Sequence, residues 1–461
     1  MTQACVPSLP FAMLGGMKIR EPIPSAPLGL DRASIKSSVI QHIAHTRMRD
    51  QYRVSPLDVL WALSRAARDR LADRWLESSK RQWDAGHKRV YYLSMEYLPG
   101  RLLRDSLANL GCLDEARAAV GELGVDLDEV LEVERDPGLG NGGLGRLASC
   151  FLDSMATLGI AGTGYGILYD YGMFEQHIVD GMQIEHPDEW LRHGSPWVVS
   201  RSETAYRVRY EGRVEPRVDE AGRTYFVWVD TKDVMAEASD LPIPGYRNGL
   251  VNTLRLWRPR PVTSFDLATF NAGDHHGSVF QRNIAEHINR VLYPNDSGPP
   301  GKELRLRQEY FFVSASLQDA VTRHLARWGT LDDLPERNVF QLNDTHPALA
   351  IAEMMRILLD EQRFTWERAW AITRRSFAYT VVHPSESAVL GCVYLLPTQK
   401  RGFDAEVYLW ARQSALASGL EDRLHAAVKA WVESSWPFTS VGFPGRSISL
   451  AAWQALGNEP R

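Results

Sequence analysis

A glycine-rich segment, Gly138-Leu-Gly-Asn-Gly-Gly-Leu-Gly145, constrains the fold of this chain more than any other feature. It leads directly into an apolar helical pattern, which predicts a helix from Leu144 to Leu158. Residues without side chains let backbone N–H groups approach an anion, and a helix N-terminus adds a favourable partial charge. The same glycines also suit a tight turn that binds nothing. The GxGxxG spacing does not separate the two, because Pro137 interrupts the strand that should precede a dinucleotide-binding loop.

Strand and helix patterns alternate around this loop. Ser55 is a suitable N-cap for a helix beginning at Pro56. The pattern over Val90–Met95 is typical of a mostly buried strand, and that over Val339–Leu342 of a shorter one that precedes a helix through Leu359. This alternation predicts a mixed α/β fold with a parallel-sheet core.

The middle of the chain has a different period. Aromatic and β-branched residues alternate with polar ones over 206–210 and again over 225–229, with Glu220-Ala-Gly222 near a turn. We therefore expect these two stretches to pair as a β-hairpin, within a β-rich insertion between helical segments.

Composition excludes several classes of partner. Lys plus Arg is 52 and Asp plus Glu is 57 among 461 residues, which leaves a net charge of −5. Nucleic acids and anionic membranes usually need a basic excess, so we expect neither as a partner. No apolar run is long enough for a membrane span. The four cysteines lie far apart, as is typical of reduced thiols in the cytoplasm, the location we expect.

Three shorter motifs have competing interpretations. Asn343-Asp-Thr-His-Pro347 follows a predicted strand, where open α/β sheets place ligands, and its carboxylate and imidazole can bind sugar hydroxyls. Asp344 or Thr345 would alternatively only cap the next helix. Gly273-Asp-His-His-Gly277 lacks a spaced third ligand, so we expect no metal site. Gly298-Pro-Pro-Gly-Lys302 lacks the Walker A spacing and is expected to be a loop.

Longer segments form a series from about Ala33 to Thr380. They are Tyr91–Tyr97 (YYLSMEY), Gly138–Leu147 (GLGNGGLGRL), Gly164–Ile167 (GYGI), Asp188–Arg192 (DEWLR), Ile243–Asn248 (IPGYRN), Val251–Trp257 (VNTLRLW), Arg290–Asp296 (RVLYPND), Lys302–Leu306 (KELRL) and Gln341–Pro347 (QLNDTHP). In this order and at this spacing, the series resembles the glycogen (α-glucan) phosphorylase family.

The resemblance implies a glycosyltransferase of the GT-B type, with two Rossmann-like domains and an active site between them. Such enzymes use inorganic phosphate to release α-glucose 1-phosphate from an α-1,4-glucan during glycogen degradation. They require pyridoxal phosphate, whose phosphate group helps to move a proton and whose aldehyde is held by a lysine of the second domain. The resemblance also implies a homodimer, allosteric control and a cytoplasmic location.

The resemblance carries several site residues over to this chain. The family's glycine loop falls on Asn141, Gly142, Gly143 and Leu144, which would approach the glucosyl unit and phosphates. The positions that line the sugar subsite, or support it, fall on Glu96, Asp344 and His346, and the acidic member of the gating loop falls on Asp296.

The chain also departs from the family pattern. The loop asparagine that would contact sugar is replaced by Ser297. The histidine that would hydrogen-bond glucose falls on Val382, and His383 lies one place further along, where a side chain generally points elsewhere. No catalytic residue of this kind is therefore expected to be intact.

These departures predict three segments: a loose leader over 1–32, a phosphorylase N-terminal domain over 33–380, and a tail over 381–461 that does not resemble the family. We expect the second domain to be missing, because neither Lys400 nor Lys429 lies in a segment like the family's Ser-Asn-Met-Lys. We expect the chain to be truncated and inactive alone, because it would supply only one wall of the active site. Removal of even one preorganised contact already lowers the rate of catalysis strongly. The alternative is a non-catalytic remnant that binds glucan or dimerises. The hypothesis of a dinucleotide-dependent enzyme would rest on the GxGxxG motif alone.

Overall fold

The computed structural model describes residues 27–382 except 221 and 264, together with 389–397, 405–411 and 441–442. From residue 380 onward, only the backbone path is described.

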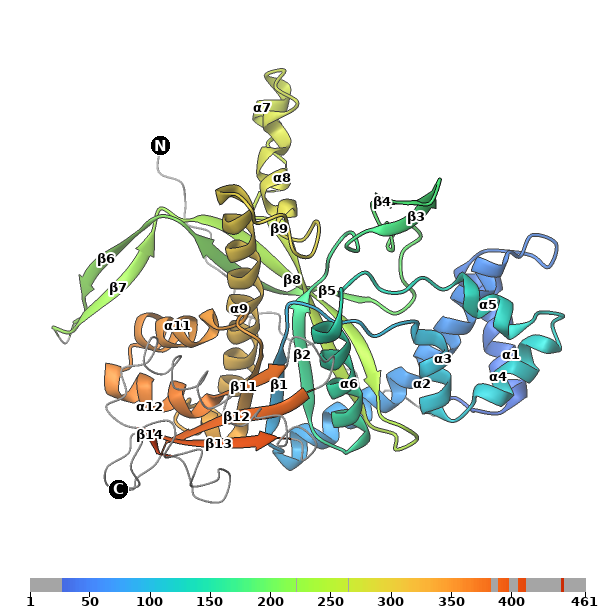
Figure 1. The fold of residues 1–461 in the computed structure, drawn as a ribbon, viewed down its shortest axis with the longest axis horizontal. Coiled ribbons are helices and arrows are strands. Elements are labelled where there is room, and N and C mark those ends of the chain that lie inside the picture. The colour runs from blue at the N-terminus through green and yellow to red at the C-terminus, as the bar shows by residue number, and fades with distance from the viewer. Residues whose placement is uncertain are drawn as a thin grey trace.

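A parallel sheet forms the centre of the described chain (Figure 1). Its five parallel strands lie in the order β11-β10-β1-β2-β9, so the predicted mixed α/β organisation with a parallel core is confirmed. These strands are β1 (Arg89–Leu93), β2 (Gly162–Ile167), β9 (Val251–Pro261), β10 (Asn338–Asn343) and β11 (Phe377–Val382). The predicted strands over 90–95 and 339–342 correspond to β1 and β10.

Antiparallel strands continue the sheet at both edges. Beyond β9 lie β8 (Lys232–Pro244) and β5 (Val199–Tyr210), and beyond β11 lie β12 (Val389–Pro397), β13 (Ala405–Ala411) and β14 (Val441–Gly442). A separate exposed hairpin consists of β3 (Glu175–Val179) and β4 (Met182–His186).

The β-rich insertion is present, but its predicted pairing is wrong. Residues 206–210 belong to β5, which pairs with β8, whereas 225–229 belong to β7 (Thr224–Val229), which pairs with β6 (Arg213–Val218). The alternating pattern correctly indicated strands on both sides, but alternation carries no information about the partner strand. The hairpin β6–β7 is therefore a shorter excursion between β5 and β8.

A row of aromatic rings crosses one face of the parallel strands. Phe377, Phe340, Tyr91, Tyr165 and Trp257 come from neighbouring strands, with successive ring centroids 5.3, 5.2, 5.5 and 6.1 Å apart. The helix α9 (Pro299–Trp328) covers this row. On the other face, the ring of Tyr92 meets Phe151 of α6 (Gly143–Thr157). The sheet is thus buried on both sides, as parallel sheets usually are.

Three helices test the sequence predictions directly. Ser55 caps α2 (Pro56–Ala85) as predicted, because its side chain accepts from the Asp58 N–H. The Asp58 carboxylate in turn accepts from the Ser55 N–H. The predicted helix over 144–158 is α6, so that prediction is confirmed. The expected loop at Gly298–Lys302 is wrong, because Pro299 occupies the first position of α9. A proline is acceptable there, since the first N–H of a helix has no intrahelical partner.

In Figure 1, the remaining helices lie on both sides of this sheet, with α11 and α12 on one side and α1, α3, α4 and α5 on the other, while α7 and α8 project beyond it. They are α1 (Arg32–Gln41), η2 (His42–Thr46), α3 (Leu102–Leu110), α4 (Leu113–Gly121), α5 (Leu127–Val133), α7 (Leu267–Asn271), η3 (Gly277–Val279), α8 (Phe280–His287), α10 (Leu334–Arg337), α11 (Leu349–Arg356), η4 (Ile357–Glu361) and α12 (Trp366–Ser376). Within the described residues, no helix is both long and apolar enough to cross a bilayer.

Of the expected leader over 1–32, residues 1–26 lie outside the description, and the remainder contacts α2. The carbonyl oxygen of Gly29 accepts from Arg70 Nε at 2.7 Å, and Leu28 N–H donates to Asp73 Oδ2 at 3.2 Å.

Candidate functional site

Glu96 and the glycine loop form the centre of the candidate site. Glu96 follows β1, and its side chain is 4% exposed. Its Oε2 accepts from the backbone N–H of Asn141 at 2.6 Å and of Gly142 at 3.4 Å. The N–H groups of the loop therefore donate to a carboxylate of the same chain.

Close packing explains two of the glycines. A Cβ on Gly140 would lie 2.7 Å from the carbonyl oxygen of Tyr97, and one on Gly145 would lie 2.9 Å from Glu96 Oε2. These positions need glycine because the loop lies against the segment that follows β1. The tight-turn interpretation thus accounts for part of the motif.

Gly142 is different, because a Cβ there would meet no atom within 4 Å. It is the N-cap of α6, without a side-chain cap. Among the described residues, the first-turn N–H groups of Gly143 and Leu144 have no acceptor, and both residues are half-buried. A helix N-terminus with free donors and open space beside it is suited to bind a phosphate or a sugar hydroxyl.

A second group of side chains lies on the other side of Glu96. Tyr293 donates its hydroxyl to Glu96 Oε1 at 2.9 Å, and its ring packs against the His346 ring at 5.6 Å. Arg305, from α9, contacts His346 Nε2 through Nη2 at 3.2 Å and pairs with Asp296 at 3.0 Å. We call Glu96, Asn141, Gly142, Tyr293, Asp296, Arg305 and His346 the site cluster.

The environment of His346 determines its protonation. The side chain is 8% exposed, and burial lowers the pKa of the imidazole. The Asp344 carboxylate opposes this shift, and the Arg305 guanidinium adds to it. Because a guanidinium only donates, Nε2 accepts from Arg305 and the neutral ring carries its proton on Nδ1. The ring therefore presents one N–H donor.

Asp344 adopts a left-handed backbone conformation, with φ of 63°, directly after β10. Its Oδ1 accepts from the neighbouring Thr345 N–H at 2.5 Å. The helix α11 begins later, at Leu349, without a side-chain cap. The capping interpretation of Asp344 and Thr345 is therefore wrong, and the Asp344 carboxylate faces the charges of the site cluster.

The remaining predicted positions do not belong to the site cluster. The Ser297 side chain is exposed, and its N–H donates to Asn295 Oδ1 at 3.1 Å. Val382 ends β11, whose Thr380 is in register with Asn343, so position 382 lies at the same carboxyl edge of the sheet as Asp344. His383, Lys400 and Lys429 lie outside the described residues.

The sequence analysis missed Tyr293 and Arg305, which join the predicted residues into one network. Both lie inside segments that matched the family series, Arg290–Asp296 and Lys302–Leu306. The sequence signal that could have indicated these two site residues was the presence of an aromatic and a cationic residue in segments that match the family.

Comparisons with known proteins bear on the family of this chain. A family model described as carbohydrate phosphorylase matches residues 120–385. The liver form of glycogen phosphorylase from Ovis aries is 48% identical over 356 residues, which cover 76% of this chain and 41% of that protein. The brain form from Homo sapiens is 46% identical over 358 residues, covering 76% and 42%. A glycogen phosphorylase from Chlamydia pneumoniae is 48% identical over 347 residues, covering 75% and 42%.

The fold and site define an α/β protein with a cluster of polar and charged side chains at the carboxyl ends of its parallel strands. The chain belongs to the carbohydrate phosphorylase family, and the relatives that it matches are glycogen phosphorylases. It spans about two fifths of the length of the curated relatives that it matches.

Pyridoxal phosphate, the cofactor of this family, would need a lysine amine for its Schiff base. The five lysines with described side chains do not supply one. Lys36, Lys80 and Lys232 pair with acidic residues, and Lys88 and Lys302 are exposed, so none belongs to the site cluster. The described residues thus do not fit covalent attachment of this cofactor. They also contain no group of three or more His, Cys, Asp or Glu residues placed to hold a metal ion.

Proposed function

We propose that these residues form the glucan- and phosphate-facing wall of an α-1,4-glucan phosphorylase, within a two-domain GT-B arrangement. The observation that carries this proposal is the open helix N-terminus at Gly142–Leu144, next to the polar side chains of the site cluster. In a carbohydrate phosphorylase, such an edge would bind the terminal glucosyl unit and phosphate.

Each part of the site cluster has a distinct task in this proposal. Glu96 holds the glycine loop in place by accepting from Asn141 and Gly142. This leaves the next N–H groups of α6 to bind oxygen atoms of the substrates. His346 would donate its Nδ1–H to a sugar hydroxyl, and Arg305 fixes the orientation of that ring.

We also propose that the 461-residue chain binds glucan without turning it over. The family's histidine position is Val382, its loop asparagine position is Ser297, and the described residues offer no cofactor lysine. Catalysis of this type depends on charges fixed in advance on both sides of a closed cleft.

Family membership also makes a homodimer the proposed assembly, which sedimentation analysis tests.

Substitution of Gly142 provides the sharpest test of the binding wall. A Cβ at this position would fill the open space beside the free N–H groups without meeting any atom of the chain. We expect Gly142→Ala to weaken maltoheptaose binding in the presence of phosphate about tenfold, which corresponds to about 1.4 kcal/mol. Isothermal titration calorimetry measures this affinity.

Gly121→Ala is the matched control, because a Cβ at Gly121 on α4 also meets no atom within 4 Å but lies away from the loop. The unchanged chain is also incubated with glycogen, phosphate and pyridoxal phosphate, and α-glucose 1-phosphate is assayed. Binding that only Gly142→Ala weakens, without product, supports the proposal. Absence of binding would refute the glucan wall, and product formation would refute the inactivity of the chain.

A further inference from the structure

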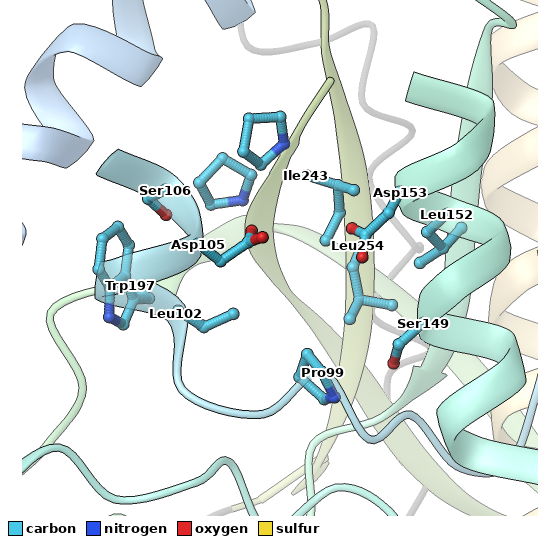
Figure 2. A pocket seen from close by; sticks show the side chains of 12 residues that line it. Pro99, Leu102, Asp105, Ser106, Ser149, Leu152, Asp153, Trp197, Ile243 and Leu254 are labelled. Atoms are coloured by element: carbon cyan, nitrogen blue, oxygen red, sulfur yellow. The ribbon is translucent and has the colours of Figure 1, made fainter. Parts of the chain in front are cut away.

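Two carboxyl groups face one another across a small cavity away from the site cluster (Figure 2). Asp105 comes from α3 and Asp153 from α6, the helix that begins at the glycine loop. The cavity has a volume of about 20 Å³. This is enough for about one water molecule. We call this space the acid cavity.

The polar groups of the acid cavity are incompletely satisfied. Ser149 also lines it, is 4% exposed, and its buried hydroxyl has no hydrogen-bond partner. Asp105 accepts from Asn109 Nδ2 at 2.9 Å. Within the described chain, the Asp153 carboxyl forms no hydrogen bond. Asp153 is half-buried and Asp105 is exposed, so the Ser149 hydroxyl is the buried group that lacks a partner. Since buried polar groups are rarely left without partners, this arrangement indicates a guest that can both donate and accept.

The other walls add no charge to the acid cavity. The lining residues of β8 and β9 are apolar, as Ile243 and Leu254 illustrate. Trp197 also lines the cavity, but its indole N–H donates to Glu134 Oε1 at 2.9 Å. The charged groups that act on Asp153 are therefore Asp105 and Arg146.

Electrostatics favour a proton in this space. Burial, followed by the nearby Asp105 carboxylate, raises the pKa of Asp153 to about 7, and Arg146 only partly opposes the shift. The Arg146 guanidinium donates instead to the carbonyl oxygens of Leu98 and Pro99, at 3.3 and 3.1 Å. Burial also raises the pKa of Asp105.

We propose that the acid cavity binds one water molecule and that Asp105 and Asp153 together retain one proton at neutral pH. The water accepts from the protonated Asp153 carboxyl and from the Ser149 hydroxyl, and it donates to Asp105. Each of these groups then has a partner, and the two neighbouring carboxyls carry one negative charge rather than two. A metal ion fits less well, because hard cations take six or more oxygen ligands. This cavity offers four side chains with oxygen atoms, those of Asp105, Ser106, Ser149 and Asp153, between apolar walls.

The retained proton makes the stability of the fold depend on pH in a defined direction. Between the ordinary aspartate pKa of 3.8 and about 7, the folded chain binds a proton at Asp153 that the unfolded chain has lost. Stability therefore falls as pH rises through this window and stays at its lower value above it.

Thermal unfolding midpoints from pH 5 to pH 8 test the proposal. Asp153→Asn keeps the shape and removes the proton site, so we expect its midpoint to fall less across this range than that of the unchanged chain. At pH 8, the variant should be the more stable by a few degrees. Asp114→Asn, on the exposed side of α4, is the matched control and should follow the unchanged chain.

Two further measurements distinguish a retained proton and a bound water from a bound cation. Infrared difference spectra at pH 6 should show a protonated carboxyl band that Asp153→Asn removes. Ser149→Ala should lower the unfolding midpoint equally at all pH values, because it removes one partner of the water. Identical pH profiles of the unchanged chain and Asp153→Asn would overturn the retained proton. A saturable rise of the midpoint with K⁺ or Na⁺, abolished by Asp153→Asn, would overturn water in favour of a cation.

Discussion

Two carboxyls in this molecule, one buried and one half-buried, have opposite ionisation. Asp319, on α9, is 1% exposed and contacts Arg255 at 3.0 Å and Arg323 at 3.1 Å. Burial acts to raise its pKa, but the guanidinium groups of Arg323 and Arg255 outweigh it and hold the pKa at about 2. In the acid cavity, burial and a second carboxyl raise the pKa of Asp153 to about 7.

The comparison shows that burial alone does not decide the charge of a carboxyl, because Asp319 is the more deeply buried of the two and yet stays ionised beside its cationic partners. Asp319 accepts from two guanidinium groups and from the hydroxyls of Tyr165 and Tyr206, at 2.5 and 3.1 Å. Asp153 has no donor within the described chain. One region therefore fixes α9 to the sheet with a permanent charge, and the other responds to pH.

The largest expected effect comes from removing the charge of Asp319. In Asp319→Asn, Arg323 would lose its carboxylate partner, and Arg255 would lose one of its two, keeping Asp240 at 2.8 Å. Since breaking a buried ion pair on one side leaves an uncompensated charge, we expect a loss of about 3–5 kcal/mol in the free energy of unfolding. Urea unfolding at pH 7 measures this loss, with Asp114→Asn as the control.

The dependence of stability on pH below 4 gives a second test of Asp319→Asn. Because the folded pKa of Asp319 lies near 2 and its ordinary value is 3.8, its contribution is present above 3.8 and is lost as pH falls toward 2. Asp319→Asn should therefore flatten the acid branch of the stability profile, whereas Asp153→Asn flattens the branch between pH 5 and pH 7. If both variants changed the same branch, the contrast between the two regions would be wrong.

Glu96 differs from Asp319 and Asp153 in its hydrogen-bond donors, which are backbone N–H groups and a phenol rather than guanidinium groups. Glu96→Gln places an NH₂ group where an acceptor is needed and leaves one buried donor unsatisfied. We expect a loss of about 1–3 kcal/mol in stability and weaker glucan binding. Urea unfolding and calorimetry measure the two effects, and Glu77→Gln on the exposed side of α2 is the control. Unchanged glucan affinity would show that Glu96 does not position the loop for binding.

Local patterns and strand order explain which parts of the site were predictable. Glu96 and Asp344 follow β1 and β10, which are adjacent parallel strands, so a correct strand prediction brings both residues to one edge. The glycine loop was predictable for a similar reason, since it opens the strongly patterned helix α6.

Long-range packing explains what was missed. Arg305 belongs to the site only because α9 lies across the sheet, and no local pattern indicates that position. The unpaired environment of Asp153 likewise depends on α3, β8 and β9, which are distant in sequence. The pairing of β5 with β8 was missed because periodicity gives the face of a strand but not its partner.

The smallest effect is expected at Tyr293, which contributes one donor to Glu96. Burial and the adjacent Glu96 carboxylate raise the pKa of Tyr293, so its hydroxyl remains protonated and continues to donate. Tyr293→Phe keeps the ring contact with His346 and removes only this bond. Because Glu96 keeps its two backbone donors, we expect a loss of about 1 kcal/mol in stability. Tyr52→Phe is the control, since Tyr52 is 86% exposed. A loss as large as that of Glu96→Gln would mean that the phenol, rather than the glycine loop, holds the Glu96 carboxylate in place.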